Sequence, residues 1–193
     1  MPGTAVDPLK FGVDPRYRYL RVQVPGSAPA LLVLGYVDPH PLGPIEVWYS
    51  ASGEVLKLQN GRVVAAHGLA MDWPSVRFDS VPVAWRDVDG RGSTYVRSRD
   101  EIPSYRFGVR ETVLTLLSEQ APILEGFAVS LPASAKLTRW YQESAQGPDG
   151  VALHSWFALG THRGEQTIVF SEQCMTHKTC LRIQVWPAYE GDM

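Results

Sequence analysis

The sequence lacks the features by which several large classes of protein are recognised. Its 193 residues include 18 Lys or Arg and 20 Asp or Glu, so the net charge is −2, and no basic cluster is present. Because binding to a phosphate backbone needs a basic surface, the composition gives no reason to expect a nucleic-acid partner. No apolar run approaches the roughly 18 residues of a membrane-spanning helix. The longest, Ala28–Val37, is interrupted by Pro29 and Gly35.

The N-terminal residues do not have the composition of a signal peptide. The opening MPGTAVDPLKFG contains neither a positively charged leading region nor an apolar stretch. We therefore expect either a cytosolic protein or the mature part of an exported one. Residues 1–15 contain three prolines without periodicity and are predicted to be a flexible tether, whereas residues 16–193 are predicted to form a single all-β domain.

Motifs for catalysis and cofactor binding are also missing. The five histidines show no metal-binding spacing, and the sequence contains neither a G-x-S-x-G nucleophile elbow nor a glycine-rich phosphate loop. We therefore expect no cofactor and no metal site. Glu46 and Glu54 are expected on neighbouring strands, which leaves open a glycan hydrolase that uses paired carboxylates.

Cysteine is scarce, and the position of the two cysteines is informative. Cys174 and Cys180 lie between the strand-like segments Gln166–Ser171 and Leu181–Trp186. Residues that face each other across a hairpin are close enough for a disulfide, which we predict here. A disulfide indicates an oxidising compartment and favours the exported form. Two reduced thiols, or a metal site that also uses His177, are the alternatives, although zinc usually takes four ligands.

Aromatic, β-branched and turn-forming residues characterise the rest of the chain. The 6 Trp, 8 Tyr, 15 Pro and 17 Gly are scattered along it, as is typical of all-β proteins. Asn60-Gly61 is a strong type I′ hairpin signal and predicts a three-stranded meander over residues 45–67. A second hairpin is predicted between Val83–Asp87 and Thr94–Ser98. Together, about a dozen short strands with short connections predict a large antiparallel meander sheet curled on itself like a barrel, with little helix.

Aromatic residues on the expected strands are the best candidates for a binding surface. Such side chains stack on sugar rings and hydrogen-bond through their polar tips. The alternative is that they fill the interior of a wide sheet. Trp156 stands out because the apolar residues around it occupy the opposite face of its strand. The candidate binding residues are Trp48, Trp140, Tyr141 and Trp156.

One run in the N-terminal half of the sequence has the pattern W-x-S-x-x-G-x-x-L-x-L-x-N-G-R and starts at Trp48. With this run at its core, the sequence resembles the YjbF/GfcB family of lipoproteins, which are tied to group 4 capsule and exopolysaccharide production in Gram-negative bacteria. The similarity is strongest over residues 17–75 and fainter over 94–186. The segments that carry it are Tyr17–Val22, Ala30–Asp38, Glu46–Ser50, Gly53–Val64 and His67–Leu69.

The resemblance implies export, removal of a signal peptide, and anchoring on the periplasmic side of the outer membrane through a lipid-modified cysteine. That cysteine is absent from this chain, so the only expected membrane contact is an anchor that the sequence does not contain. We expect a non-enzymatic accessory protein of capsule or exopolysaccharide biosynthesis or secretion, whose partners are the polysaccharide or secretion proteins of the envelope. A glycan hydrolase and a barrel that binds a small apolar ligand are the alternatives.

Overall fold

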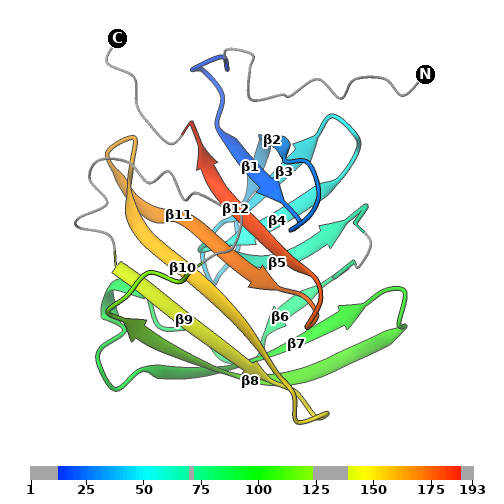
Figure 1. Ribbon diagram of the computed structural model, residues 1–193, viewed down its shortest axis with the longest axis vertical. Helices are drawn as coiled ribbons and strands as arrows, with labels where there is room; N and C mark the ends of the chain where they lie inside the picture. Colours follow the sequence, from blue (N-terminus) through cyan, green and yellow to red (C-terminus); the bar gives the residue numbers. More distant parts are fainter. Residues whose placement is uncertain (1–12, 70–71, 124–138, 188–193) are drawn as a thin grey trace.

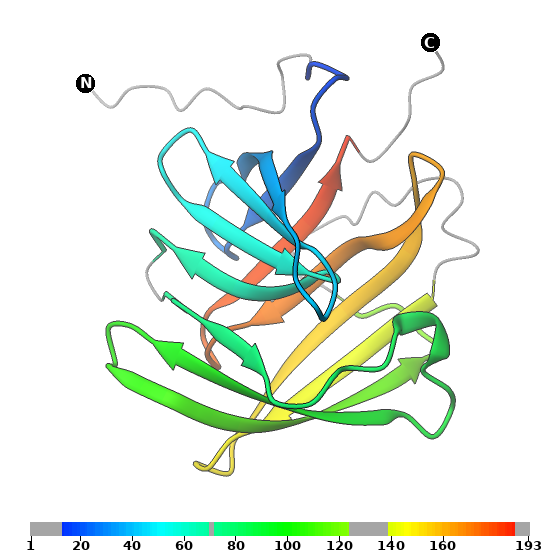
Figure 2. The same cartoon turned by 180° about the vertical axis from the view of Figure 1, so that it is seen from behind.

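Twelve antiparallel β-strands form one continuous sheet that wraps into a nearly closed barrel (Figures 1 and 2). The structure is a computed structural model, and it describes residues 13–69, 72–123 and 139–187. Within these ranges the only helix is a single 3-10 turn, Trp85–Asp87. The architecture confirms the predicted fold class. The strands are β1 (Tyr19–Gln23), β2 (Ala30–Asp38), β3 (Ile45–Ser50), β4 (Val55–Gln59), β5 (Arg62–His67), β6 (Val76–Phe78), β7 (Ser93–Glu101), β8 (Arg106–Ser118), β9 (Arg139–Gln146), β10 (Ala152–His162), β11 (Glu165–Cys174) and β12 (Cys180–Trp186).

The sheet order places the first and last strands side by side at its centre. In space the strands follow the order β5-β4-β3-β2-β1-β12-β11-β10-β9-β8-β7-β6. Two sequential meanders are thus joined through the β1–β12 pair, in which Leu20 faces Val185. At the far edges, Ala66 of β5 and Trp73 form an isolated bridge with N–O distances of 2.9 and 3.1 Å. This bridge brings the two edges together and nearly closes the barrel.

Alternation between buried and exposed residues explains why the long strands form. Along β8, buried and exposed positions alternate from Val109 onward, and Val113 is completely buried. One face of the strand therefore points into the barrel and the other points outward. The last strand differs: the polar residues Arg182 and Gln184 are buried, as are Leu181 and Ile183. Strand β12 is therefore covered on both faces.

The Asn60-Gly61 turn adopts the backbone conformation that its sequence predicts. Asn60 has φ 51° and Gly61 has φ 79°, so both central residues have the positive φ of a type I′ turn. The predicted three-stranded meander is confirmed as β3, β4 and β5. The tip of this hairpin reaches across the barrel, because a Cβ atom on Gly61 would lie 2.5 Å from Cγ1 of Ile168 on β11.

The segment before β7 corrects one prediction. Val83–Asp87 was expected to pair with Thr94–Ser98, but β7 pairs with β6 and β8 instead. Trp85 lies in the 3-10 turn, is buried, and donates its indole N–H to the Asn60 carbonyl over 2.8 Å. Burial of this indole at the end of the barrel stabilises a turn where local alternation suggested a strand.

Two other expectations concern domain organisation. The predicted tether, residues 1–15, lies outside the described residues apart from residues 13–15. All twelve strands belong to one sheet. Three apolar clusters pack in and around it, and the largest contains Trp48, Trp73 and Tyr95 with aliphatic residues from both meanders.

Candidate functional site: outer strip, interior charges and barrel mouth

The four predicted binding residues lie in different environments. Trp48, Trp140 and Tyr141 are only 2%, 8% and 0% exposed, so they do not present a contact surface. Trp48 belongs to the main core, and Tyr141 packs against Trp85 with ring centroids 5.1 Å apart. Trp156 is partly exposed. Three of the four residues are therefore buried, and only Trp156 remains a candidate for a surface contact.

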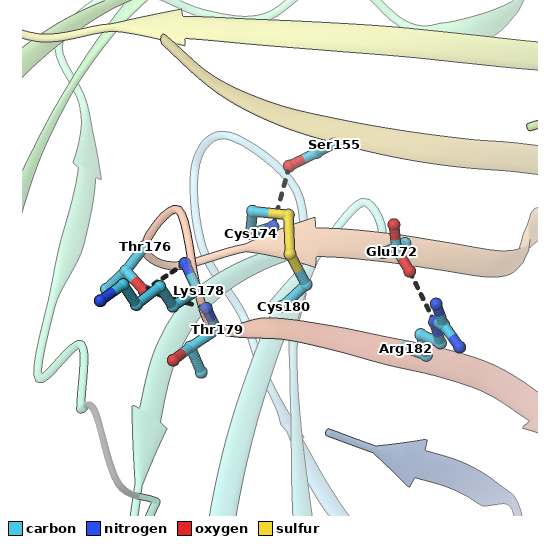
Figure 3. The surroundings of a disulfide bond; sticks show 8 residues. All are labelled: Ser155, Glu172, Cys174, Thr176, Lys178, Thr179, Cys180 and Arg182. Atoms are coloured by element: carbon cyan, nitrogen blue, oxygen red, sulfur yellow. Dashed lines mark hydrogen bonds and ion pairs between the residues drawn. A yellow bond between two sulfur atoms is a disulfide. The ribbon is translucent and has the colours of Figure 1, made fainter. Parts of the chain in front are cut away.

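Trp156 belongs to a row of side chains on the outer face of the sheet, in which Arg182 is buried and the other members are half-buried. In the strand register it faces Gln142 on β9 and Glu172 on β11, and Glu172 in turn faces Arg182 on β12. Nε of Arg182 lies 2.6 Å from Oε2 of Glu172, so the two side chains form an ion pair (Figure 3). We call Gln142, Trp156, Glu172 and Arg182 the outer strip. It combines an aromatic face with amide and charged groups.

The predicted disulfide between Cys174 and Cys180 is confirmed next to this strip. The two residues face each other at the mouth of the β11–β12 hairpin, and their sulfur atoms are bonded (Figure 3). Within the turn, the Thr176 hydroxyl accepts hydrogen bonds from the backbone N–H groups of Lys178 and Thr179, at 3.1 and 3.0 Å. The disulfide replaces both alternatives, the reduced thiols and the metal site with His177.

A buried ion pair inside the barrel was not foreseen from the sequence. Nε and Nη2 of Arg62 donate to Oε1 of Glu143 over 3.0 and 2.8 Å, and both side chains are only 4% exposed. The hydroxyls of Tyr95 and Thr115 also donate to this carboxylate, over 3.0 and 2.9 Å. Burial, followed by the nearby carboxylate, raises the pKa of the Tyr95 phenol, so it remains a neutral donor. Four hydrogen bonds thus converge on the Glu143 carboxylate.

A second buried cluster lies nearby on β7 and β8. Nε of Arg97 and Nε of Arg99 donate to the two oxygens of Glu111, over 2.8 and 2.9 Å. Arg99 also pairs with Glu101, and both guanidinium groups lie over the ring of Trp73, at 5.3 and 4.8 Å from its centroid. Arg97 and Arg99 are two residues apart in β7 and so share one strand face, and Arg97 directly faces Glu111 across the β7–β8 hairpin. This spacing was the available signal in the sequence.

The carboxylates considered for hydrolysis do not form a pair. Glu46 faces Leu58 in the β3–β4 ladder, while Glu54 lies four residues before Leu58 in the chain. At about 3.3 Å per residue this places them roughly 13 Å apart along the hairpin, beyond the ~5–9.5 Å that glycoside hydrolysis uses. A hydrogen bond from the Ser50 hydroxyl lowers the pKa of Glu54. This carboxyl is therefore a poor general acid.

Two cavities lie beside the β10–β11 hairpin, at one end of the barrel. Figure 1 shows the position of this hairpin. One has a volume of about 510 Å³ and the other about 430 Å³, and both contact Gln166. We call the two cavities together the hairpin mouth. Its first cavity is lined by residues that include Arg18, Glu46, Trp48, His162, Arg163 and Glu165, and its second by residues that include Arg86, Asp87, Arg139 and Thr161.

The opposite end of the barrel has two smaller cavities. One, of about 170 Å³, is mainly apolar and is lined by side chains such as Val22, Leu32 and Leu56. The other, of about 150 Å³, reaches the buried Arg99 and Glu111. Both are smaller than the ~300–1,000 Å³ of most ligand sites.

Comparison with known proteins identifies the family. The family described as group 4 capsule polysaccharide lipoprotein gfcB, YjbF matches residues 15–151. This chain belongs to that family. Membership in a lipoprotein family implies association with the cell envelope, and the family's description names no enzymatic activity.

A solved structure shares the family's fold. The crystal structure of the hypothetical lipoprotein YmcC from Escherichia coli (K12) superposes with a TM-score of 0.66 at 16% sequence identity, over 88% of this chain and 83% of that one. At this identity the likeness shows the fold alone. No curated protein sequence matches the chain significantly.

The family motif is structural in this chain. Its Leu56 and Leu58 are buried in the core, and its Asn60-Gly61 forms the type I′ turn. The family match includes Arg18, Glu46 and Trp48 of the hairpin mouth but ends before the β10–β11 hairpin.

Two further properties concern metals and membranes. Among residues 13–69, 72–123 and 139–187, no group of three or more His, Cys, Asp or Glu side chains is arranged to hold a metal ion. Within the same described ranges, no helix is long and apolar enough to cross a membrane.

Proposed function

We propose that this protein is a non-enzymatic, exported accessory component of capsule or exopolysaccharide biosynthesis or secretion. It is held by a lipid anchor on the periplasmic side of the outer membrane and binds the polysaccharide or a protein of the secretion machinery. The match of residues 15–151 to the capsule polysaccharide lipoprotein family is the observation that carries this proposal. The Cys174–Cys180 disulfide supports export, because such bonds persist in oxidising compartments.

The outer strip is the proposed contact surface. Trp156 offers a partly exposed indole on a regular sheet, flanked by Gln142 on one side and the Glu172–Arg182 ion pair on the other. An indole face packs against the C–H groups of a sugar ring or against an apolar side chain, and neighbouring polar groups fix the orientation. Such a rigid aromatic anchor provides binding energy without any chemical step.

The two alternative functions receive less support from the geometry. Glu46 and Glu54 are too far apart to flank one glycosidic bond. The apolar cavity of about 170 Å³ is below the size of an ordinary small-molecule site.

A genetic and a biochemical measurement test the proposal. In the bacterium that carries the gene, deletion should lower the exported polysaccharide, and the wild-type gene should restore it. Complementation with Trp156→Ala should restore it only in part, although the purified variant keeps the wild-type unfolding temperature. Incubation of purified protein with the polysaccharide should release no new reducing ends. Unchanged polysaccharide output after deletion, or turnover that a single carboxylate substitution abolishes, would contradict the proposal.

A further inference from the structure

The hairpin mouth is a second candidate binding site, separate from the outer strip. Gln166, an exposed residue of the β10–β11 hairpin, lines both cavities, so the two lie next to each other at the end of the barrel. Each volume lies within the range of ligand sites, and barrel mouths are a common place for such sites. The mouth is therefore large enough for a segment of a chain rather than a single small ion.

Trp48 forms part of the wall of the first cavity. The residue is 2% exposed, and its indole N–H is itself buried, without a hydrogen-bond acceptor among the described residues. What Trp48 offers the cavity is therefore its aromatic ring rather than a hydrogen-bond donor. An aromatic ring in a cavity wall packs against the C–H groups of a sugar.

Arg18 and Glu46 lie beside the same indole. Nη2 of Arg18 is 2.6 Å from Oε1 of Glu46, and its guanidinium carbon lies 5.5 Å from the centroid of the Trp48 ring. A guanidinium offers several donors in one plane, and a carboxylate offers only acceptors. Side by side, the two groups match vicinal hydroxyls, each of which donates one hydrogen bond and accepts others.

The charges of the mouth favour an acidic ligand. Four arginines line the two cavities against three carboxylates, Glu46, Asp87 and Glu165. The mouth thus has one more cation than anion, whereas the whole chain has a net charge of −2. Arg18 is already paired with Glu46, and Arg163 donates to the backbone carbonyls of residues 15 and 17, over 3.2 and 3.1 Å. In the second cavity Nε of Arg86 lies 3.7 Å from Oδ1 of Asp87, and both side chains are exposed. With Arg139, this cavity has two guanidinium groups for one carboxylate, so Arg86 and Arg139 are the candidates for binding a carboxylate of the ligand.

We propose that the hairpin mouth binds a segment of an acidic oligosaccharide. Hydroxyl groups of the oligosaccharide occupy the first cavity, where they contact Trp48 and the Arg18–Glu46 pair. Carboxylate groups bind in the second cavity, at Arg86 and Arg139. This assignment rests on the proposed function, because it takes the exported polysaccharide as the ligand. It adds the location of the binding site and the acidic character of the polysaccharide.

A matched pair of ligands tests the role of charge. Short oligosaccharides are prepared from the exopolysaccharide of the bacterium that carries the gene, and one portion is carboxyl-reduced so that each carboxylate becomes an alcohol. Titration calorimetry at low salt should show binding of the native oligosaccharides and binding weaker by roughly tenfold or more for the reduced ones. Added salt should remove most of that difference. Equal affinity for both ligands would overturn the proposal.

Substitutions test the location of the site. Arg86→Gln and Arg139→Gln should each raise the Kd for the native oligosaccharides by roughly tenfold and change it little for the reduced ones. Trp48→Phe replaces the indole in the wall of the first cavity with a smaller ring and should weaken the binding of both ligands. Arg77→Gln is the matched control, since it removes an exposed arginine that pairs with Asp100 on the β6–β7 side and should leave both Kd values unchanged.

The outcomes separate the two proposals. If Arg86→Gln and Arg139→Gln bind like the wild type while Trp156→Ala loses binding, the mouth is not the site, yet the proposed function stands. If the wild type binds neither ligand but gene deletion still lowers polysaccharide output, the mouth proposal fails and a protein partner is indicated. If deletion also has no effect, both proposals fail.

Discussion

Replacing Glu143 by Gln should unfold the barrel more readily than any single surface change. Glu143→Gln keeps the side-chain shape but removes the negative charge that compensates Arg62. Arg62 would then be a buried cation, 4% exposed, whose guanidinium carbon lies 3.7 Å from the centroid of the Trp85 ring and cannot reach water. Tyr95 and Thr115 would in addition donate to a weaker acceptor.

The expected loss follows from measured buried pairs. Removing one partner of such a pair costs about 3–5 kcal/mol, because the remaining charge stays desolvated. For a chain of this size each kcal/mol lowers the melting temperature by about 2–4 °C, which gives a total of roughly 6–20 °C. Thermal and urea unfolding, followed by circular dichroism with the disulfide intact, measure this loss.

Two further variants make the test specific. Arg62→Met combined with Glu143→Leu removes both charges and should regain much of the stability, since apolar replacement of a whole buried pair is often neutral or favourable. Arg77→Gln breaks the exposed Arg77–Asp100 pair and should cost less than about 1 kcal/mol. The reasoning is refuted if Glu143→Gln is no more destabilising than Arg77→Gln, or if the double variant is worse than the single one.

The remaining predictions concern turns, the disulfide and pH. Gly61→Ala should destabilise the protein by about 1–3 kcal/mol in urea unfolding, because Gly61 has φ 79° and a Cβ would lie 2.5 Å from Ile168; Gly53→Ala, at φ 98° with open space around it, isolates the backbone part of that loss. Cys174→Ser with Cys180→Ser should cost about 2 kcal/mol by loop closure, and an unchanged urea midpoint would exclude it. The lowered pKa of Glu54 contributes stability that is present above its unfolded-state pKa and lost as pH falls through the folded value. Ser50→Ala should therefore flatten the acid side of the stability–pH curve, and an identical curve would argue against this hydrogen bond.

Local patterns in the sequence determined the strands and their turns. The Asn60-Gly61 turn, the meander over residues 45–67 and the Cys174–Cys180 disulfide all depend on neighbours within one hairpin, where turn chemistry and alternation specify the geometry. The fold class followed because short connections between successive strands permit few topologies other than a meander. The family match covers residues 15–151, which include the meander over residues 45–67.

Closure of the barrel decided which side chains face the interior and what they contact. Alternation places Trp48 and Tyr141 on one face of a strand, but only the wrapping of twelve strands turns that face into an enclosed space. A barrel widens with its number of strands, so this interior accommodates large aromatic side chains and whole ion pairs. Arg62 and Glu143 are 81 residues apart and meet only because the two meanders face each other. The pairing of β1 with β12, and of β12 with β11, brings Arg18 close to the β10–β11 hairpin. No pattern within a single strand predicts that proximity.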